Sequence, residues 1–145
     1  MKYSKYLDLE ELVPQQIFSQ FAGRSAQFLD HRAGELLDRI RELVDEPIRI
    51  NDWHTGGIFS QSGFRMPDTL VGGKLSQHKF GRGFDLKISL THNVKTYEEF
   101  RKLIKDNFEE LNKLGLTTIE MATPTWLHID LRFTGLDYLY EVPYR

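Results

Sequence analysis

The sequence has no cysteine, no long apolar run and almost no excess charge of either sign. Its 145 residues include 19 lysines and arginines against 21 aspartates and glutamates, a formal net charge of −2. Without cysteine there are no disulfides, thiolate zinc sites or cysteine nucleophiles, so a transition metal would have to use His, Asp or Glu. Because acids and bases are interspersed, no basic surface is evident, and we expect no nucleic-acid partner.

No segment approaches the roughly 20 apolar residues of a membrane span. Asp8, Glu10 and Glu11 interrupt the N-terminal segment, which therefore lacks the apolar stretch of a signal peptide. We expect a monomer without membrane insertion, cytoplasmic as synthesised. The length favours one domain over residues 1–145, with a helical N-terminal part to about residue 46 and a core from about 47 to 135.

The stretch from Ser76 to Asp85, Ser-Gln-His-Lys-Phe-Gly-Arg-Gly-Phe-Asp, contains the first candidate functional residues. His78 and Asp85 are seven positions apart, a spacing that does not suit one face of a helix. The glycines between them allow the chain to turn back. From Gly83 to Ile88 the side chains alternate with the period of a half-buried strand, so Asp85 is expected to project from a rigid element.

A second alternating stretch lies some forty residues later, from Trp126 to Phe133. Its apolar face would hold Leu127, Ile129, Leu131 and Phe133, and its polar face Trp126, His128, Asp130 and Arg132. If this strand pairs with the first, His78, Asp85 and His128 meet. Two imidazoles and one carboxylate with an open fourth position are typical of catalytic zinc. Asp130 could orient a ligand imidazole or pair with Arg132.

The remaining elements are predicted from periodicity and from residues that begin or end helices. Helices are expected from Gln15 to Gly23, between Asp30 and Pro47, and from a capping box at Thr96 to Gly115. Residues 48–53 alternate as a strand, 54–74 are expected to form a long glycine-rich loop, and 136–145 to pack on the surface. A hairpin turn over 122–125 would place Glu120 opposite His128.

Two further side chains are candidates for contact with a ligand. Arg65, in the long loop, suits either a surface salt bridge or a grip on a substrate carboxylate or carbonyl oxygen. Trp126 shares the polar face of its strand, which favours a position in the wall of a cleft. His31, His54 and His92 lack paired spacing, and we expect them on the surface.

The pattern Ser-x-His-x-x-Gly-x-small-x-Asp, followed by Trp-x-His-x-Asp on a later strand, resembles the zinc D-Ala-D-Ala carboxypeptidase family. That family includes phage L-alanyl-D-glutamate endolysins and is related in fold to the Hedgehog signalling domain. Arg65, preceded by Ser-Gly-Phe, is similar to the arginine with which the family contacts substrate. The sequence departs from the pattern at two positions. Thr125 stands where some relatives carry the catalytic glutamate, and Trp126 stands where others carry a histidine.

The resemblance implies an α+β fold in which helices cover a small antiparallel sheet that binds one zinc through His78, Asp85 and His128. It implies hydrolysis of amide bonds in bacterial peptidoglycan peptides, as by a phage enzyme delivered to the cell wall. Glu120 would be the general base, Arg65 would act in catalysis and substrate binding, and Ser76 and Trp126 would contact substrate. The alternatives are a non-catalytic zinc-containing binding module and a phage structural protein on the same fold.

Overall fold

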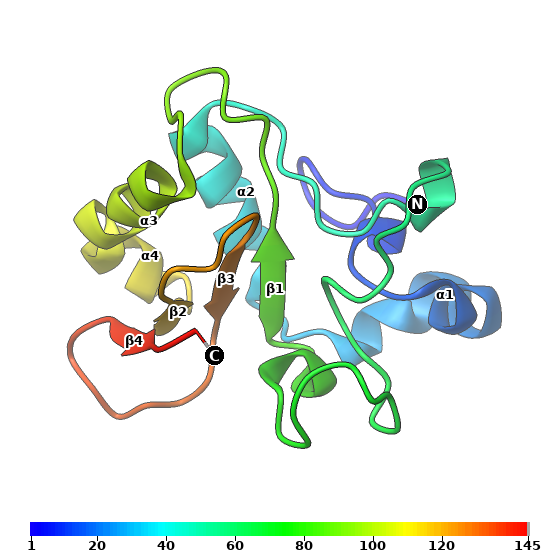
Figure 1. Cartoon of the computed structure of the whole chain (residues 1–145). Helices are drawn as coiled ribbons and strands as arrows, with labels where there is room; N and C mark the ends of the chain where they lie inside the picture. The colour runs from blue at the N-terminus through cyan, green and yellow to red at the C-terminus, as the bar shows by residue number, and fades with distance from the viewer. Residues whose placement is uncertain (145) are drawn as a thin grey trace.

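The computed structural model describes residues 1–144 and has an α+β architecture around a four-stranded sheet (Figure 1). The strand order is β1-β3-β2-β4, and the strands are β1 (Gly83–Leu86), β2 (Thr118–Glu120), β3 (Leu127–Asp130) and β4 (Tyr140–Val142). β1 and β2 pair antiparallel with β3, whereas β4 pairs parallel with β2. The α+β class is confirmed, but the sheet is mixed.

The expectation of a purely antiparallel sheet is wrong because of the C-terminal segment. Both edges of β3 are occupied, by β1 and β2, and the outer side of β1 is bonded to Ser62 and Arg49, so the returning chain pairs with the remaining edge of β2. It reverses direction once after β3 and therefore runs parallel to β2, with Met121 N–H donating to the Val142 carbonyl at 2.8 Å. The tail that was expected to pack on the surface thus contributes a short strand, Tyr140–Val142, to the sheet.

Four α-helices accompany the sheet: α1 (Gln15–Phe21), α2 (Ala33–Val44), α3 (Tyr97–Asp106) and α4 (Phe108–Lys113). In Figure 1, α2 lies behind the sheet, with α3 and α4 beside it. The helix predicted between Thr96 and Gly115 is interrupted at Asn107, whose side chain donates to the Leu103 carbonyl at 2.8 Å. Among residues 1–144, no helix has the length and apolar character needed to cross a bilayer.

The core lies between the sheet and the helices. Alternate strand residues and the apolar stripes of α2 and α3 are fully buried, including Phe84, Ile119, Ile129, Leu36, Ile40, Phe100 and Ile104. The alternation predicted for β3 ends early, because the strand stops at Asp130 and Phe133 is 90% exposed. The predicted strand at 48–53 is reduced to one bridge between Arg49 and Lys87, because the chain then enters a 3₁₀ turn at Trp53–Thr55.

Arg101 joins α3 to the β2–β3 connection from a position that is only 2% exposed. Its guanidinium donates to the Glu120 carbonyl at 3.3 Å and to the carbonyl and hydroxyl of Thr123. We expect Arg101→Met to lower the free energy of unfolding by about 2–3 kcal/mol, because the carbonyls lose a charged donor. Urea unfolding measures this loss, and the exposed neighbour Lys102 provides the control: Lys102→Met should change stability by less than about 0.5 kcal/mol.

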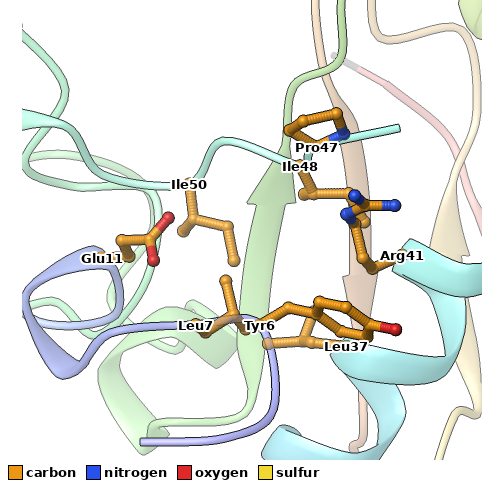
Figure 2. Close-up of a pocket in the computed structure, with 8 residues that line it drawn as sticks. All are labelled: Tyr6, Leu7, Glu11, Leu37, Arg41, Pro47, Ile48 and Ile50. Atoms are coloured by element: carbon orange, nitrogen blue, oxygen red, sulfur yellow. The ribbon is translucent and has the colours of Figure 1, made fainter. Parts of the chain in front are cut away.

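A cavity of about 260 Å³ lies between the N-terminal segment, α2 and residues 47–50 (Figure 2). Its lining is mainly aliphatic and aromatic, with Glu11 and Arg41 as its charged residues. None of its lining residues contributes to the cavity around His78 and His128. It is therefore separate from the site described next.

Candidate metal centre

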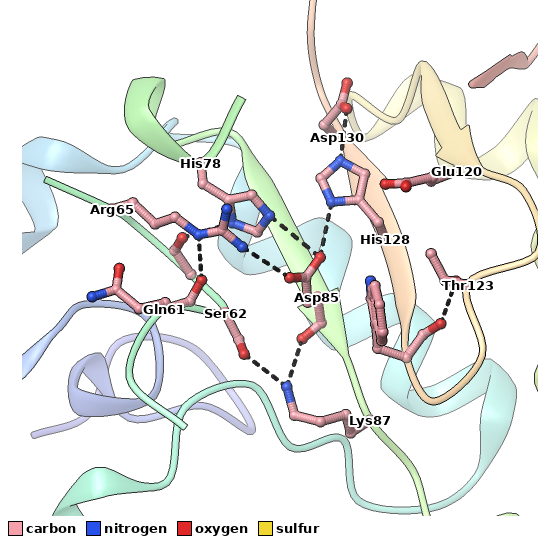
Figure 3. Close-up of polar contacts among 12 residues, drawn as sticks. Gln61, Ser62, Arg65, His78, Asp85, Lys87, Glu120, Thr123, His128 and Asp130 are labelled. Carbon is pink, nitrogen blue, oxygen red and sulfur yellow. Dashed lines mark hydrogen bonds and ion pairs between the residues drawn. The ribbon is translucent and has the colours of Figure 1, made fainter. Parts of the chain in front are cut away.

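Three elements bring His78, Asp85 and His128 together (Figure 3). In the ladder between β1 and β3, Asp85 lies directly opposite His128. His78 comes from the 3₁₀ helix η4 (Gln77–Phe80), immediately before β1. One ligand atom from each residue lies within 4.8 Å of the other two. The strand pairing expected from the sequence is confirmed, and so is the meeting of these three side chains.

The turn between His78 and Asp85 depends on glycine. Gly81 ends η4 with a φ of +69°, in the left-handed region. A Cβ at this position would lie 1.8 Å from the Phe28 carbonyl oxygen, and a Cβ on Gly83 would lie 2.9 Å from the His78 nitrogen. Side chains at either position would therefore clash with neighbouring backbone and disturb the turn that carries His78.

Hydrogen bonds on the far side of each imidazole set which nitrogen faces Asp85. His78 Nδ1 donates to the Gly63 carbonyl at 2.8 Å, which leaves Nε2 at 3.3 Å from Asp85 Oδ1. His128 Nε2 bonds Asp130 Oδ2 at 2.9 Å, and Nδ1 lies 2.9 Å from the same Asp85 oxygen. Tetrahedral zinc with bonds of about 2.0–2.1 Å separates its ligand atoms by about 3.3 Å. The donor set suits such an ion, and the separations of 3.3 and 2.9 Å from Asp85 Oδ1 to the two imidazole nitrogens are close to that value.

Asp130 carries out both of the roles that the sequence left open. It is fully buried, accepts from His128, and also forms a two-pronged pair with the Arg132 guanidinium. Carboxylates behind a ligand imidazole fix the orientation of the ring and increase its basicity. Asp130 is therefore a positioning residue for His128.

Burial and mutual hydrogen bonds shift the pKa values of Asp85, His128 and His78. Burial would raise the pKa of Asp85, but hydrogen bonds from His128 and His78 outweigh it and hold the pKa far below its ordinary value. Burial would lower the pKa of His128, yet the bonds to Asp130 and Asp85 raise it to about 9. Burial lowers the pKa of His78. A bound cation would replace the proton on His128, since a metal ligand must be a neutral imidazole.

Arg65 forms a partly buried salt bridge with Asp85. Its Nη2 lies 3.2 Å from Asp85 Oδ2, and its Nε donates to the Gln61 carbonyl at 2.6 Å. Its side chain is only 11% exposed. Of the two alternatives considered from the sequence, the salt bridge is present, but it is partly buried and not on the surface, because residues 61–65 run beside β1 and bring the guanidinium against the carboxylate.

A cavity of about 480 Å³ opens onto His78, Asp85 and His128. The other candidates predicted from the sequence, Arg65, Ser76, Glu120 and Trp126, all line it. Glu120 continues the register of β2 with β3 by one position and so faces His128, and Figure 3 shows its carboxylate directed toward that ring. Burial raises the pKa of Glu120. This carboxyl group therefore lies where a proton acceptor beside the metal would be needed.

Sequence reasoning missed three contributors to the site. The Gly63 carbonyl, which orients His78, leaves no signal in the side-chain pattern. Val142 and Pro143 line the cavity because β4 joins the sheet, so the metal-site core extends beyond residue 135.

The histidines outside the motif, His31, His54 and His92, are exposed, as expected.

Comparison of the chain with protein-family models, with curated proteins and with solved structures found no match. The candidate site therefore rests on the geometry above and on the sequence motif.

Asp130→Asn tests the positioning role of the buried carboxylate. We expect zinc affinity to fall about 10–100-fold, because an amide supports the His128 ring less strongly and leaves Arg132 without its charged partner. Competition with a chromophoric chelator measures the change. Asp137→Asn, at an exposed position in the loop before β4, is the matched control and should leave the affinity unchanged. Equal affinity in the two variants would contradict the role of Asp130.

Proposed function

We propose that this protein is a zinc-dependent peptidase that hydrolyses amide bonds in bacterial peptidoglycan peptides. The observation that carries the proposal is the convergence of His78, Asp85 and His128 on one point in a cavity that also holds Glu120 and Arg65. Three protein ligands with an open fourth position are the arrangement of catalytic zinc, whereas structural zinc is usually enclosed by four.

Zinc in this position would supply Lewis-acid chemistry, since it activates water near neutral pH and polarises a carbonyl group. Glu120, facing His128 from β2, would accept a proton from the attacking water and return it to the leaving amine. Its burial, which raises the pKa, suits a group that must take up and release a proton. Arg65 would stabilise negative charge on the substrate oxygen, provided that its guanidinium turns from Asp85 toward the cavity.

The substrate class comes from the motif. The spacing of Ser76, His78, Gly81, Gly83 and Asp85, followed by His128 on a paired strand, resembles the zinc D-Ala-D-Ala carboxypeptidase and L-alanyl-D-glutamate endolysin family. Thr125 and Trp126 replace side chains that relatives use near the last ligand. The position of Glu120 in the cavity supports it as the replacement for the missing glutamate.

The experiment is digestion of purified peptidoglycan by protein prepared with one equivalent of zinc and by the same protein after chelation. We expect the zinc-loaded protein to release stem peptides or D-alanine, detected by mass spectrometry, and the chelated protein to release none. Release that is insensitive to chelation would contradict a metal-dependent reaction. Zinc-loaded protein that binds walls without releasing any product would instead favour the non-catalytic binding module.

A further inference from the structure

A second cavity adjoins the metal centre on the other side of Trp126. It has a volume of about 350 Å³ and shares Asp85 and Trp126 with the metal cavity, so the two spaces have a common wall. Its charged lining is mainly cationic, from Lys87 and Arg49. Asp85 is its one acidic lining residue, and the carboxylate of Asp85 is engaged by the two histidines and Arg65. We call this space the Lys87 cavity.

Lys87 is a buried cation with no ion-pair partner among the residues that the structure describes. It is 6% exposed, and its ammonium group donates to Ser62 Oγ at 2.8 Å and to the Asp85 carbonyl at 3.4 Å (Figure 3). Within residues 1–144, no carboxylate oxygen lies within the 4.0 Å of an ion pair from Lys87 Nζ. Burying an unpaired charge is unfavourable, and such a group is stabilised when an anion binds beside it.

Arg49 adds a second positive charge at the mouth of the same cavity. Its guanidinium lies 5.3 Å from the centroid of the Phe59 ring, and Lys87 Nζ lies 4.3 Å from the same centroid. The Arg49 side chain is 58% exposed and its contact with Asp52 is long, at 3.8 Å. Because this ion pair is long and the side chain is largely exposed, the guanidinium can also engage an incoming anion, while the Phe59 ring covers the ammonium group of Lys87.

We propose that the Lys87 cavity is a subsite for a free carboxylate group carried by one residue of the peptide substrate. The inference rests on the proposed peptidase function and adds to it the class of substrate, an acidic peptide. A carboxylate would complete the hydrogen bonding of Lys87 and meet Arg49 at the entrance, as a charge-assisted contact.

The distance between the two cavities sets where that carboxylate lies. Lys87 follows Asp85 by two residues, just beyond the end of β1 and in an extended bridge with Arg49, and two extended residues span about 7 Å. An extended peptide covers this distance in about two residues. The recognised carboxylate therefore belongs to a residue within about two positions of the scissile bond, close enough to fix the register of the substrate.

The test is calorimetric binding of two capped wall-type peptides that differ only in whether the glutamate residue carries a free carboxylate or a carboxamide. Both are titrated into the zinc-loaded full chain with Glu120→Gln, so that turnover does not interfere. We expect the carboxylate peptide to bind about tenfold more tightly. Adding Lys87→Met should abolish this preference, and Lys87→Arg should preserve most of it.

Two further variants change exposed side chains, so their effect on peptide binding does not depend on whether Lys87→Met folds. Arg49→Gln changes an exposed side chain and should reduce the preference without disturbing the core. Lys74→Met removes the same charge from the exposed loop beside the metal cavity and should leave the preference at its full value. Melting curves show whether Lys87→Met is folded.

The outcomes separate this inference from the proposed function. Equal binding of the two peptides, or a preference that survives Lys87→Met in folded protein, overturns the subsite even if the wild-type protein cleaves walls. A preference that depends on Lys87 in a protein that cleaves no wall preparation supports the subsite and contradicts the peptidase.

Discussion

Glu120→Gln is expected to lower peptide release from peptidoglycan by about 10²–10⁴-fold while the protein still binds one zinc. The factor is that of a positioned general base, and the amide keeps the shape of the side chain but cannot accept the proton. Glu120 faces His128 across the strand pair without being one of the three ligand residues, so the zinc site should remain intact. Product release by mass spectrometry and zinc content by atomic emission are measured on the same preparation.

Glu109→Gln is the matched control, because Glu109 is an exposed acid on α4 outside the cavity. It should retain wild-type activity and zinc. If Glu120→Gln hydrolyses walls as fast as the wild-type protein, the proton acceptor is another group. If it loses zinc together with activity, Glu120 acts on the metal site and not on the water.

His78→Ala is expected to abolish both zinc binding and the stabilisation that zinc provides. Zinc at 100 times its dissociation constant would stabilise the folded wild-type protein by about 2.7 kcal/mol. For a domain of this size that corresponds to a rise in melting temperature of roughly 5–10 °C. The variant has only two of the three ligands, so its melting temperature should not respond to zinc. Differential scanning calorimetry with and without zinc measures both values.

His31→Ala controls for the loss of an imidazole, since the His31 side chain is 92% exposed and lies outside the site. Its zinc response should match that of the wild-type protein. A wild-type protein whose melting temperature is insensitive to zinc would contradict the metal centre itself. That result would favour a structural protein that keeps the fold without the metal.

In the two proposals together, the cavity of the candidate metal site and the cationic Lys87 cavity share Asp85 and Trp126. The carboxylate of Asp85 faces the histidines, whereas its backbone carbonyl accepts from Lys87. A ligand of the metal and the residue that sets the substrate register would then lie two positions apart, at the end of β1 and just beyond it.

The sequence alone determined the local elements that carry the site. The alternation around Asp85 and His128 predicted two strands, and the glycines predicted the turn that returns His78 to them. These signals are local, because strand periodicity and the left-handed conformation of Gly81 depend on neighbouring residues. Glu120 was predicted opposite His128 for the same reason, since a short turn fixes the register of a hairpin.

Only the tertiary structure decided which distant groups complete the site. The place of β4 depends on which sheet edge is free, and the Arg65 pair with Asp85 depends on how the loop over residues 61–65 folds across β1. The unpaired charge of Lys87 is visible only once burial is known, because an alternating strand does not show what covers its polar face. These features depend on long-range packing, which residue spacing does not encode.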